Sequence, residues 1–177
     1  MVTTDPERTD AGLIDDFRGA GNLSRLGTPW RLITDQVMGG VSRGQLVRAP
    51  RDGRSAIGLT GELSLENNGG FVQANLALAP AGLFDASAHS GVRILVQGDD
   101  QTYGLHLKSA DTDLPWQSYR AGFSAPPAWQ ELRFPFTAFV PYRVAAPLAR
   151  SRLLRLGVVA IGRVTRFELW IAEIGFY

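Results

Sequence analysis

The chain has 177 residues, a length that suits one domain rather than two. Its 18 basic and 17 acidic residues give a formal net charge of +1, so no global field attracts nucleic acid or an anionic membrane. The lack of cysteine excludes disulfides, thiol nucleophiles and thiolate metal sites, and two histidines offer little for a histidine-rich metal site. We therefore expect neither a metal nor a cofactor.

Residues 1–12 are polar and acidic, a pattern that differs from a secretory signal or an organellar transit peptide. No run approaches the roughly 20 apolar residues of a membrane-spanning helix. We expect a cytoplasmic protein with a flexible tail over residues 1–12 and a single domain over residues 13–177.

From Leu13 onward, short stretches of alternating apolar and polar residues lie between turn signals, and 20 glycines and 10 prolines favour many turns. The helical signals are two short turns, at Pro80–Ser87 and Pro135–Phe139. This pattern predicts an all-β fold, an antiparallel sandwich or jelly roll. The predicted strands, in chain order, are Leu13–Phe17, Gln45–Arg48, Ala56–Leu63, Phe71–Leu78, Val92–Gln97, Tyr103–Ser109, Ser118–Phe123, Gln130–Phe134, Leu153–Val159 and Arg166–Ile174.

Side chains suited to catalysis are scarce. His106 alternates outward within a predicted strand, His89 lies in a turn, and no Gly-x-Ser-x-Gly elbow occurs. The paired carboxylates at Asp15–Asp16 and Asp99–Asp100 are candidates for acid–base work, but the second pair has the composition of a hairpin turn. We expect no catalytic centre. A calcium ion bound by loop carboxylates and carbonyls is an alternative that the sequence leaves open, although no EF-hand spacing supports it.

The most specific motif runs Trp30-Arg-Leu-Ile-Thr-Asp35-Gln-Val-Met38-Gly39-Gly40-Val-Ser42. Five further blocks follow in order: Leu59–Ser64, Asn68-Gly69-Gly70-Phe71, Gly98–Tyr103, Trp129 with Pro135–Phe139, and Phe167–Ile171. In these blocks the chain resembles the complex I intermediate-associated protein family, over nearly its whole length after residue 12.

The resemblance implies a galactose-binding-like jelly roll and a non-enzymatic assembly role through protein contacts. The expected partner is then a subunit or assembly intermediate of the respiratory NADH–quinone oxidoreductase. The chain departs from the family in lacking a mitochondrial presequence and in lacking a glycine after Arg143, so it looks like a stand-alone bacterial member.

The motif has a structural and a functional interpretation. In the structural one, Asp35 accepts backbone N–H groups of its own loop, Met38 plugs the end of the sandwich, and Ser42 returns a hydrogen bond. In the functional one, the same end of the sandwich binds a ligand or partner. The candidate residues at this end are Asp35, Met38, Gly39, Gly40, Ser42, Asn68, Gly69 and Gly70, and we expect the second glycine pair to pack beside the first.

Charge offers another candidate surface. Six arginines and no acid occupy residues 143–166, so Arg150 and Arg152 are candidates for docking an acidic partner, the alternative being a solvated loop.

The alternative function is carbohydrate recognition by aromatic side chains. Trp116, Tyr119, Trp129 and Trp170 are candidates for a sugar-stacking platform, with Gln117 or Arg120 fixing hydroxyls, unless these rings lie in the core.

Overall fold

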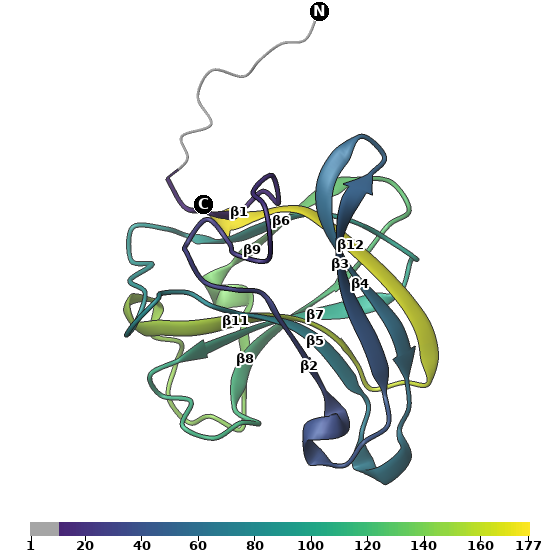
Figure 1. Cartoon of the computed structure of the whole chain (residues 1–177). Coiled ribbons are helices and arrows are strands. Elements are labelled where there is room, and N and C mark those ends of the chain that lie inside the picture. Colours follow the sequence, from purple (N-terminus) through teal and green to yellow (C-terminus); the bar gives the residue numbers. More distant parts are fainter. Residues whose placement is uncertain (1–10) are drawn as a thin grey trace, which may run out of the picture.

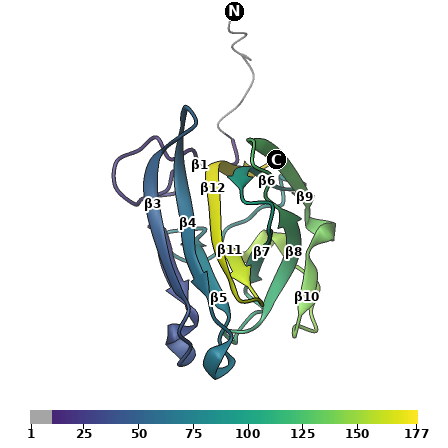
Figure 2. The same cartoon turned by 90° about the vertical axis from the view of Figure 1, so that its right-hand side faces the viewer.

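A computed structural model describes residues 11–177 and shows two antiparallel sheets packed face to face (Figures 1 and 2). The expected N-terminal tail lies outside the described residues, apart from Ala11 and Gly12. None of the helices formed by the described residues has the length and hydrophobicity of a membrane span.

The first sheet has the strand order β3-β4-β12-β6-β9, and β1 pairs with β12. Its strands are β1 (Leu13–Asp15), β3 (Arg43–Arg51), β4 (Arg54–Leu63), β6 (Gly91–Gly98), β9 (Gln130–Pro135) and β12 (Thr165–Phe176). The second sheet has the order β10-β8-β7-β11-β5-β2. Its strands are β2 (Arg31–Thr34), β5 (Phe71–Ala77), β7 (Thr102–Ser109), β8 (Ser118–Ser124), β10 (Val140–Tyr142) and β11 (Leu153–Ile161).

The helices are short 3₁₀ turns in the loops. They are η1 (Asp35–Met38), η2 (Glu66–Asn68), η3 (Phe136–Ala138) and η4 (Arg150–Arg152). The turn predicted at Pro135–Phe139 is confirmed as η3, whereas Pro80–Ser87 forms bends and an isolated bridge rather than a helix.

All ten predicted strands are present, and their ends differ from the prediction by at most two residues, except that β3 continues three residues further, to Arg51. The sequence prediction missed β2 and β10. Both are short edge strands whose side chains are mostly exposed, so they lack the apolar alternation that identifies a strand.

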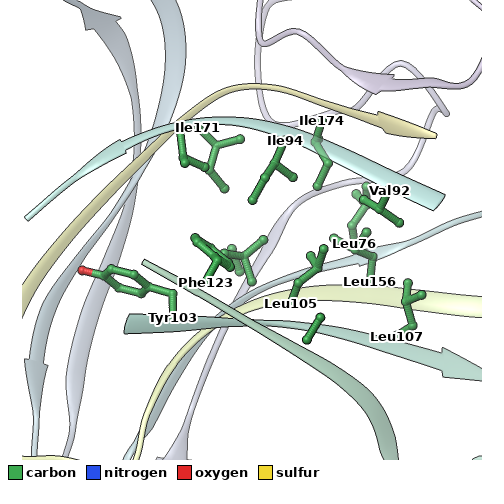
Figure 3. Packing of buried hydrophobic residues seen from close by; sticks show 14 of the residues in the cluster. Leu76, Val92, Ile94, Tyr103, Leu105, Leu107, Phe123, Leu156, Ile171 and Ile174 are labelled. Atoms are coloured by element: carbon green, nitrogen blue, oxygen red, sulfur yellow. The ribbon is translucent and has the colours of Figure 1, made fainter. Parts of the chain in front are cut away.

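The core lies between the sheets, where the inward-facing residues of both meet (Figure 3). Tyr103, Leu105 and Leu107 point inward from β7, and Ile171 and Ile174 face them from β12. The predicted alternation of β7 is therefore confirmed, because Gly104, His106 and Lys108 occupy the positions that face away from the core.

The predicted carboxylate pairs hold strands and turns together. Asp15 is buried and accepts hydrogen bonds from Trp30 Nε1 (2.8 Å) and from the Arg48 guanidinium (3.2 Å). Asp99 Oδ1 accepts the Gln101 amide at 3.2 Å, so the predicted hydrogen bond to the local backbone is confirmed, but the turn connects β6 to β7 in the other sheet and does not close a hairpin. Asp99 also accepts the Tyr103 hydroxyl at 2.8 Å and the Glu168 amide at 2.9 Å. Burial and the nearby Asp99 carboxylate together raise the pKa of Tyr103, which keeps its hydroxyl a donor.

Candidate functional site

The carboxylate of Asp35 is fully buried and binds backbone amides of two different loops. Its Oδ1 accepts the amide of Ser42 at 3.0 Å, and its Oδ2 accepts those of Gly70 at 2.6 Å and Phe71 at 3.4 Å. The predicted local closure is confirmed, and it extends to a second turn 35 residues away. We call Asp35 and these amides the Asp35 cage.

Further hydrogen bonds join the loops around the cage. The Ser42 hydroxyl pairs with both the amide and the carbonyl of Ser64, and Asn67 Nδ2 donates to the Gly39 carbonyl at 3.1 Å. The amide of Gly162, in the β11–β12 turn, donates to the Gly70 carbonyl at 2.8 Å. Three loops therefore meet at the lower end of the molecule in Figure 1 and are fixed to one another.

The glycines of the motif serve different purposes. Gly39 ends η1 with a φ of 88°, a left-handed conformation that favours glycine. Gly40 needs no positive φ; a Cβ there would lie 2.6 Å from Asp35 Oδ1, and one at Gly69 would lie 2.5 Å from Asp35 Oδ2. Gly40 and Gly69 thus make room for the buried carboxylate, and the two glycine pairs pack on the same side chain, as expected.

Met38 does not plug the sandwich, contrary to the prediction. The η1 turn directs its first residue, Asp35, inward and leaves Val37 and Met38 exposed by 75% and 58%. The interior position that the methionine was expected to fill belongs to the hydrogen-bonded carboxylate. Other exposed apolar side chains on the same three loops are Val41, Leu65 and Val164.

An open groove of about 620 Å³ runs beside these residues, between β2 and the start of β3. Leu32, Ile33 and Val37 form its apolar lining, and Arg43 lies at its border. Both strands are sheet edges, and β2 makes no hydrogen bonds to β3, so the groove follows the open seam between the sheets.

Two opposed effects act on the pKa of Asp35. Burial acts to raise it, but hydrogen bonds from Ser42 and from the amides of Gly70 and Phe71 outweigh burial and hold the pKa below the usual value. The carboxylate is therefore ionised at neutral pH.

The outer face of the second sheet has a different chemistry. None of its six strands contains Asp or Glu, whereas Arg31, Lys108, Arg120 and Arg155 all alternate to the side away from the core. Lys108 lies directly opposite Arg155 in the β7–β11 pairing. This face is therefore cationic, although the whole chain is nearly neutral.

The cations of this face contact neutral groups. Arg155 donates to Asn75 at 3.0 Å, Lys108 donates to the Leu114 and Pro115 carbonyls, and Arg120 stacks over the Tyr142 ring with 3.7 Å to its centroid. Burial, together with Arg120 and Lys108, lowers the pKa of His106 to about 3, so this imidazole is neutral among the cations.

The four aromatic residues proposed for sugar stacking are not brought together. Tyr119 is fully buried because it alternates to the same, core-facing side of β8 as Phe123. Its hydroxyl donates to the Ala146 carbonyl at 2.7 Å. Trp170 lies in a small apolar cluster on the other sheet, and Trp129 packs against that cluster. Trp116, in the β7–β8 loop, is exposed by 51%.

The arginine-rich segment is exposed at Arg150 and Arg152, as predicted. Arg152 forms an ion pair with Asp111 at 3.3 Å, and Arg150 donates to the His89 carbonyl at 3.3 Å. The segment also supplies Arg155 to the cationic face, so its arginines divide between two surfaces.

Within residues 11–177, no group of three or more His, Cys, Asp or Glu side chains is placed to hold a metal ion. The two histidines contact different parts of the fold. His89 stacks on Phe176, and His106 lies over Gly104.

A sequence model of the family described as complex I intermediate-associated protein 30 (CIA30) matches residues 16–173. The chain belongs to the CIA30 family. The match spans the Asp35 cage and both sheets, so the resemblance seen in the separate motifs extends over the whole fold. No curated protein matches this CIA30 chain in sequence.

Solved structures with the same fold as this CIA30 chain include carbohydrate-binding modules from Clostridium thermocellum. The family 11 module of the cellulase Lic26A-Cel5E superposes with a TM-score of 0.71 at 12% identity, covering 93% of this chain and 92% of the module. A second structure of the family 11 module, in complex with a β-1,3-1,4-mixed-linked tetrasaccharide, gives a TM-score of 0.65 at 12% identity, covering 93% and 94%. The family 30 module of Cel9D-Cel44B gives 0.57 at 12% identity, covering 94% and 90%. The CIA30 chain is thus a galactose-binding-like jelly-roll sandwich.

Proposed function

We propose that this CIA30 member is a non-enzymatic binding protein that acts through protein–protein contacts, as an assembly factor for a redox complex. The observation that carries the proposal is the group of exposed apolar side chains on the three loops joined around Asp35. Exposed apolar groups of this kind mark interaction sites in soluble proteins. The family membership supports a protein as the partner, and the groove beside Val37 offers room for a partner's side chains.

The double variant Val37→Ser/Met38→Ser tests this assignment. Both side chains are exposed and outside the cage, so we expect the melting temperature to stay within about 2 °C of the wild type. Proteins that co-purify with a tagged wild-type chain, quantified by mass spectrometry, should fall at least about tenfold, the loss that 1.4 kcal/mol of binding energy gives. Val140→Ser, an equally exposed apolar residue on β10, is the control. An unchanged set of co-purifying proteins would refute the assignment.

The exposed arginines give a second, electrostatic prediction. If Arg150 and Arg152 dock an acidic partner, Arg150→Glu/Arg152→Glu should weaken partner capture at 0.1 M salt and have less effect at 1 M, because the Debye length shrinks from about 10 Å to about 3 Å. Arg54→Glu/Arg166→Glu, on the other sheet, reverses the same amount of charge as a control. Equal losses in both double variants would assign the effect to net charge alone.

The alternative function is carbohydrate recognition, which the fold of the C. thermocellum modules favours. Trp116 and Tyr142 are exposed aromatic residues near the second sheet, and they could stack on a sugar ring. A glycan array run beside the co-purification experiment separates the two functions. Array binding that Val37→Ser/Met38→Ser leaves intact would favour this alternative.

A further inference from the structure

The outer face of the second sheet carries an unbalanced charge. Arg31, Lys108, Arg120 and Arg155 project from four of its strands, and none of them forms an ion pair with a carboxylate among residues 11–177. Like charges directly opposite each other on neighbouring strands are destabilising, and Lys108 and Arg155 occupy such positions. On the strands of the first sheet, in contrast, five of the seven arginines pair with acids of the same sheet, as Arg93 does with Glu173. Cations held together without partners suit a surface that receives its anions from a ligand.

The centre of this face is a polar surface formed by Gln73, Asn75 and His106. Gly157 leaves space that the Gln73 side chain occupies, and Gly104 does the same for His106. Asn75 Nδ2 donates a hydrogen bond to Gln73 Oε1 at 2.6 Å, and Asn75 Oδ1 accepts one from Arg155. Amide and guanidinium groups fixed in this way are suited to bind hydroxyl and carboxylate oxygens.

The spacing of the cations indicates an extended ligand. Arg120 on β8 and Arg31 on β2 lie four strand positions apart in the order β8-β7-β11-β5-β2. With about 4.8 Å between neighbouring strands, the cations extend over roughly 19 Å. A single small anion reaches only part of this row, whereas a chain with repeated anionic groups reaches all of it.

The central part of this face also lacks the apolar anchors of a protein interface. Its four central strands, β8, β7, β11 and β5, expose no large apolar side chain except Ile161 at the end of β11. Protein interfaces concentrate their binding energy in buried apolar and aromatic anchors, which the loops around Asp35 offer and these four strands do not. The net charge of +1 is also small for a binder of nucleic acid.

We propose that the outer face of the second sheet binds an anionic polysaccharide that carries carboxylate groups along its chain, with Arg120, Lys108, Arg155 and Arg31 as its cationic contacts. This site is separate from the loops around Asp35. It gives the carbohydrate alternative a location and predicts that charge, more than aromatic stacking, selects the sugar.

The test is isothermal titration of the full chain with polygalacturonate, beside a neutral mixed-linked β-glucan, poly-glutamate and single-stranded DNA. We expect binding of polygalacturonate that weakens with salt, and weaker binding of the other three. Arg120→Gln/Arg155→Gln should lower the affinity at least about tenfold, a loss of 1.4 kcal/mol. Arg120→Lys/Arg155→Lys should retain most of it, because the charge is kept. Arg54→Gln/Arg166→Gln, on the other sheet, is the matched control and should bind like the wild type.

Several outcomes would overturn the proposal. They are no binding of polygalacturonate by the wild type, an equal loss in the control, or no loss in a folded Gln double variant. Equal or tighter binding of poly-glutamate or DNA would assign the face to an acidic protein or to nucleic acid instead. If Arg120→Gln/Arg155→Gln melts well below the wild type, its loss of binding is not used, and the test rests on Arg120→Lys/Arg155→Lys. Failure of this Lys variant to bind polygalacturonate would then contradict the proposal. Loss of protein partners in Val37→Ser/Met38→Ser is independent of each of these results.

Discussion

Replacing Asp35 with alanine should lower the free energy of unfolding by about 3–5 kcal/mol, because it leaves two buried amides and one half-buried amide without an acceptor, at about 1–3 kcal/mol each. For a chain of this length, that loss corresponds to a fall in melting temperature of roughly 6–20 °C. Chemical denaturation and thermal melts measure the two quantities. Asp111→Ala removes a carboxylate that makes one exposed ion pair with Arg152, so it should stay within about 0.5 kcal/mol of the wild type. Equal melting temperatures for Asp35→Ala and the wild type would contradict the structural role of the cage.

The pH dependence of the stability that Asp35 provides follows from the lowered pKa of this carboxyl. A carboxylate with a lower pKa in the folded than in the unfolded chain stabilises the fold above the unfolded value of about 3.8, and this stabilisation is lost as the pH falls through the folded value. The stability difference between the wild type and Asp35→Asn should therefore be constant from about pH 7 to pH 5 and shrink below about pH 4. A difference that grew on acidification would show the opposite sign of the pKa shift.

Valine at Gly40 should destabilise the protein more than valine at Gly39, although only Gly39 has a positive φ. At Gly39 the side chain would meet open space, so the cost is that of the left-handed backbone, about 1–3 kcal/mol. At Gly40 it would displace the Asp35 carboxylate and break its hydrogen bonds, for a total of roughly 3–5 kcal/mol.

Denaturant melts of the two glycine variants give the order directly. Gly19→Val is the control, because Gly19 has neither a positive φ nor an atom within 4 Å of an added Cβ. If Gly39→Val cost more than Gly40→Val, backbone strain rather than space for the carboxylate would dominate this loop.

The prediction from sequence was most successful where a signal is local. Alternation located ten strands, and the short Asp35–Ser42 spacing predicted a closed loop. Met38 was predicted to be buried on the same local grounds. The sequence around it does not reveal that Asp35 finds enough hydrogen-bond donors in the fold to be buried instead. Asp35 gains two of its three amides from residues 70 and 71, a pairing that depends on the tertiary fold.

The cationic face could not be predicted from the sequence for a related reason. Arg31, Lys108, Arg120 and Arg155 come from four strands far apart in the chain, and they share a face only through the order β10-β8-β7-β11-β5-β2. The arginine-rich stretch at 143–166 is evident in the sequence, but there Arg155 is grouped with Arg150 and Arg152 only because they are near one another in the chain. The strand order instead joins Arg155 to Lys108 and separates it from Arg150 and Arg152, which lie in or beside a loop.

The hydrogen bonds that join the three loops around Asp35 also affect the thermodynamics of association at this end of the molecule. A loop that becomes ordered only on binding loses conformational entropy of about 1–2 kcal/mol per residue, and this loss is subtracted from the affinity. Here the backbone at Ser42, Gly70 and Gly162 is already fixed by internal hydrogen bonds before a partner arrives. Val37 and Met38 are thus displayed on a rigid support, so the partner contact proposed for these side chains should lose little affinity to the ordering of loops.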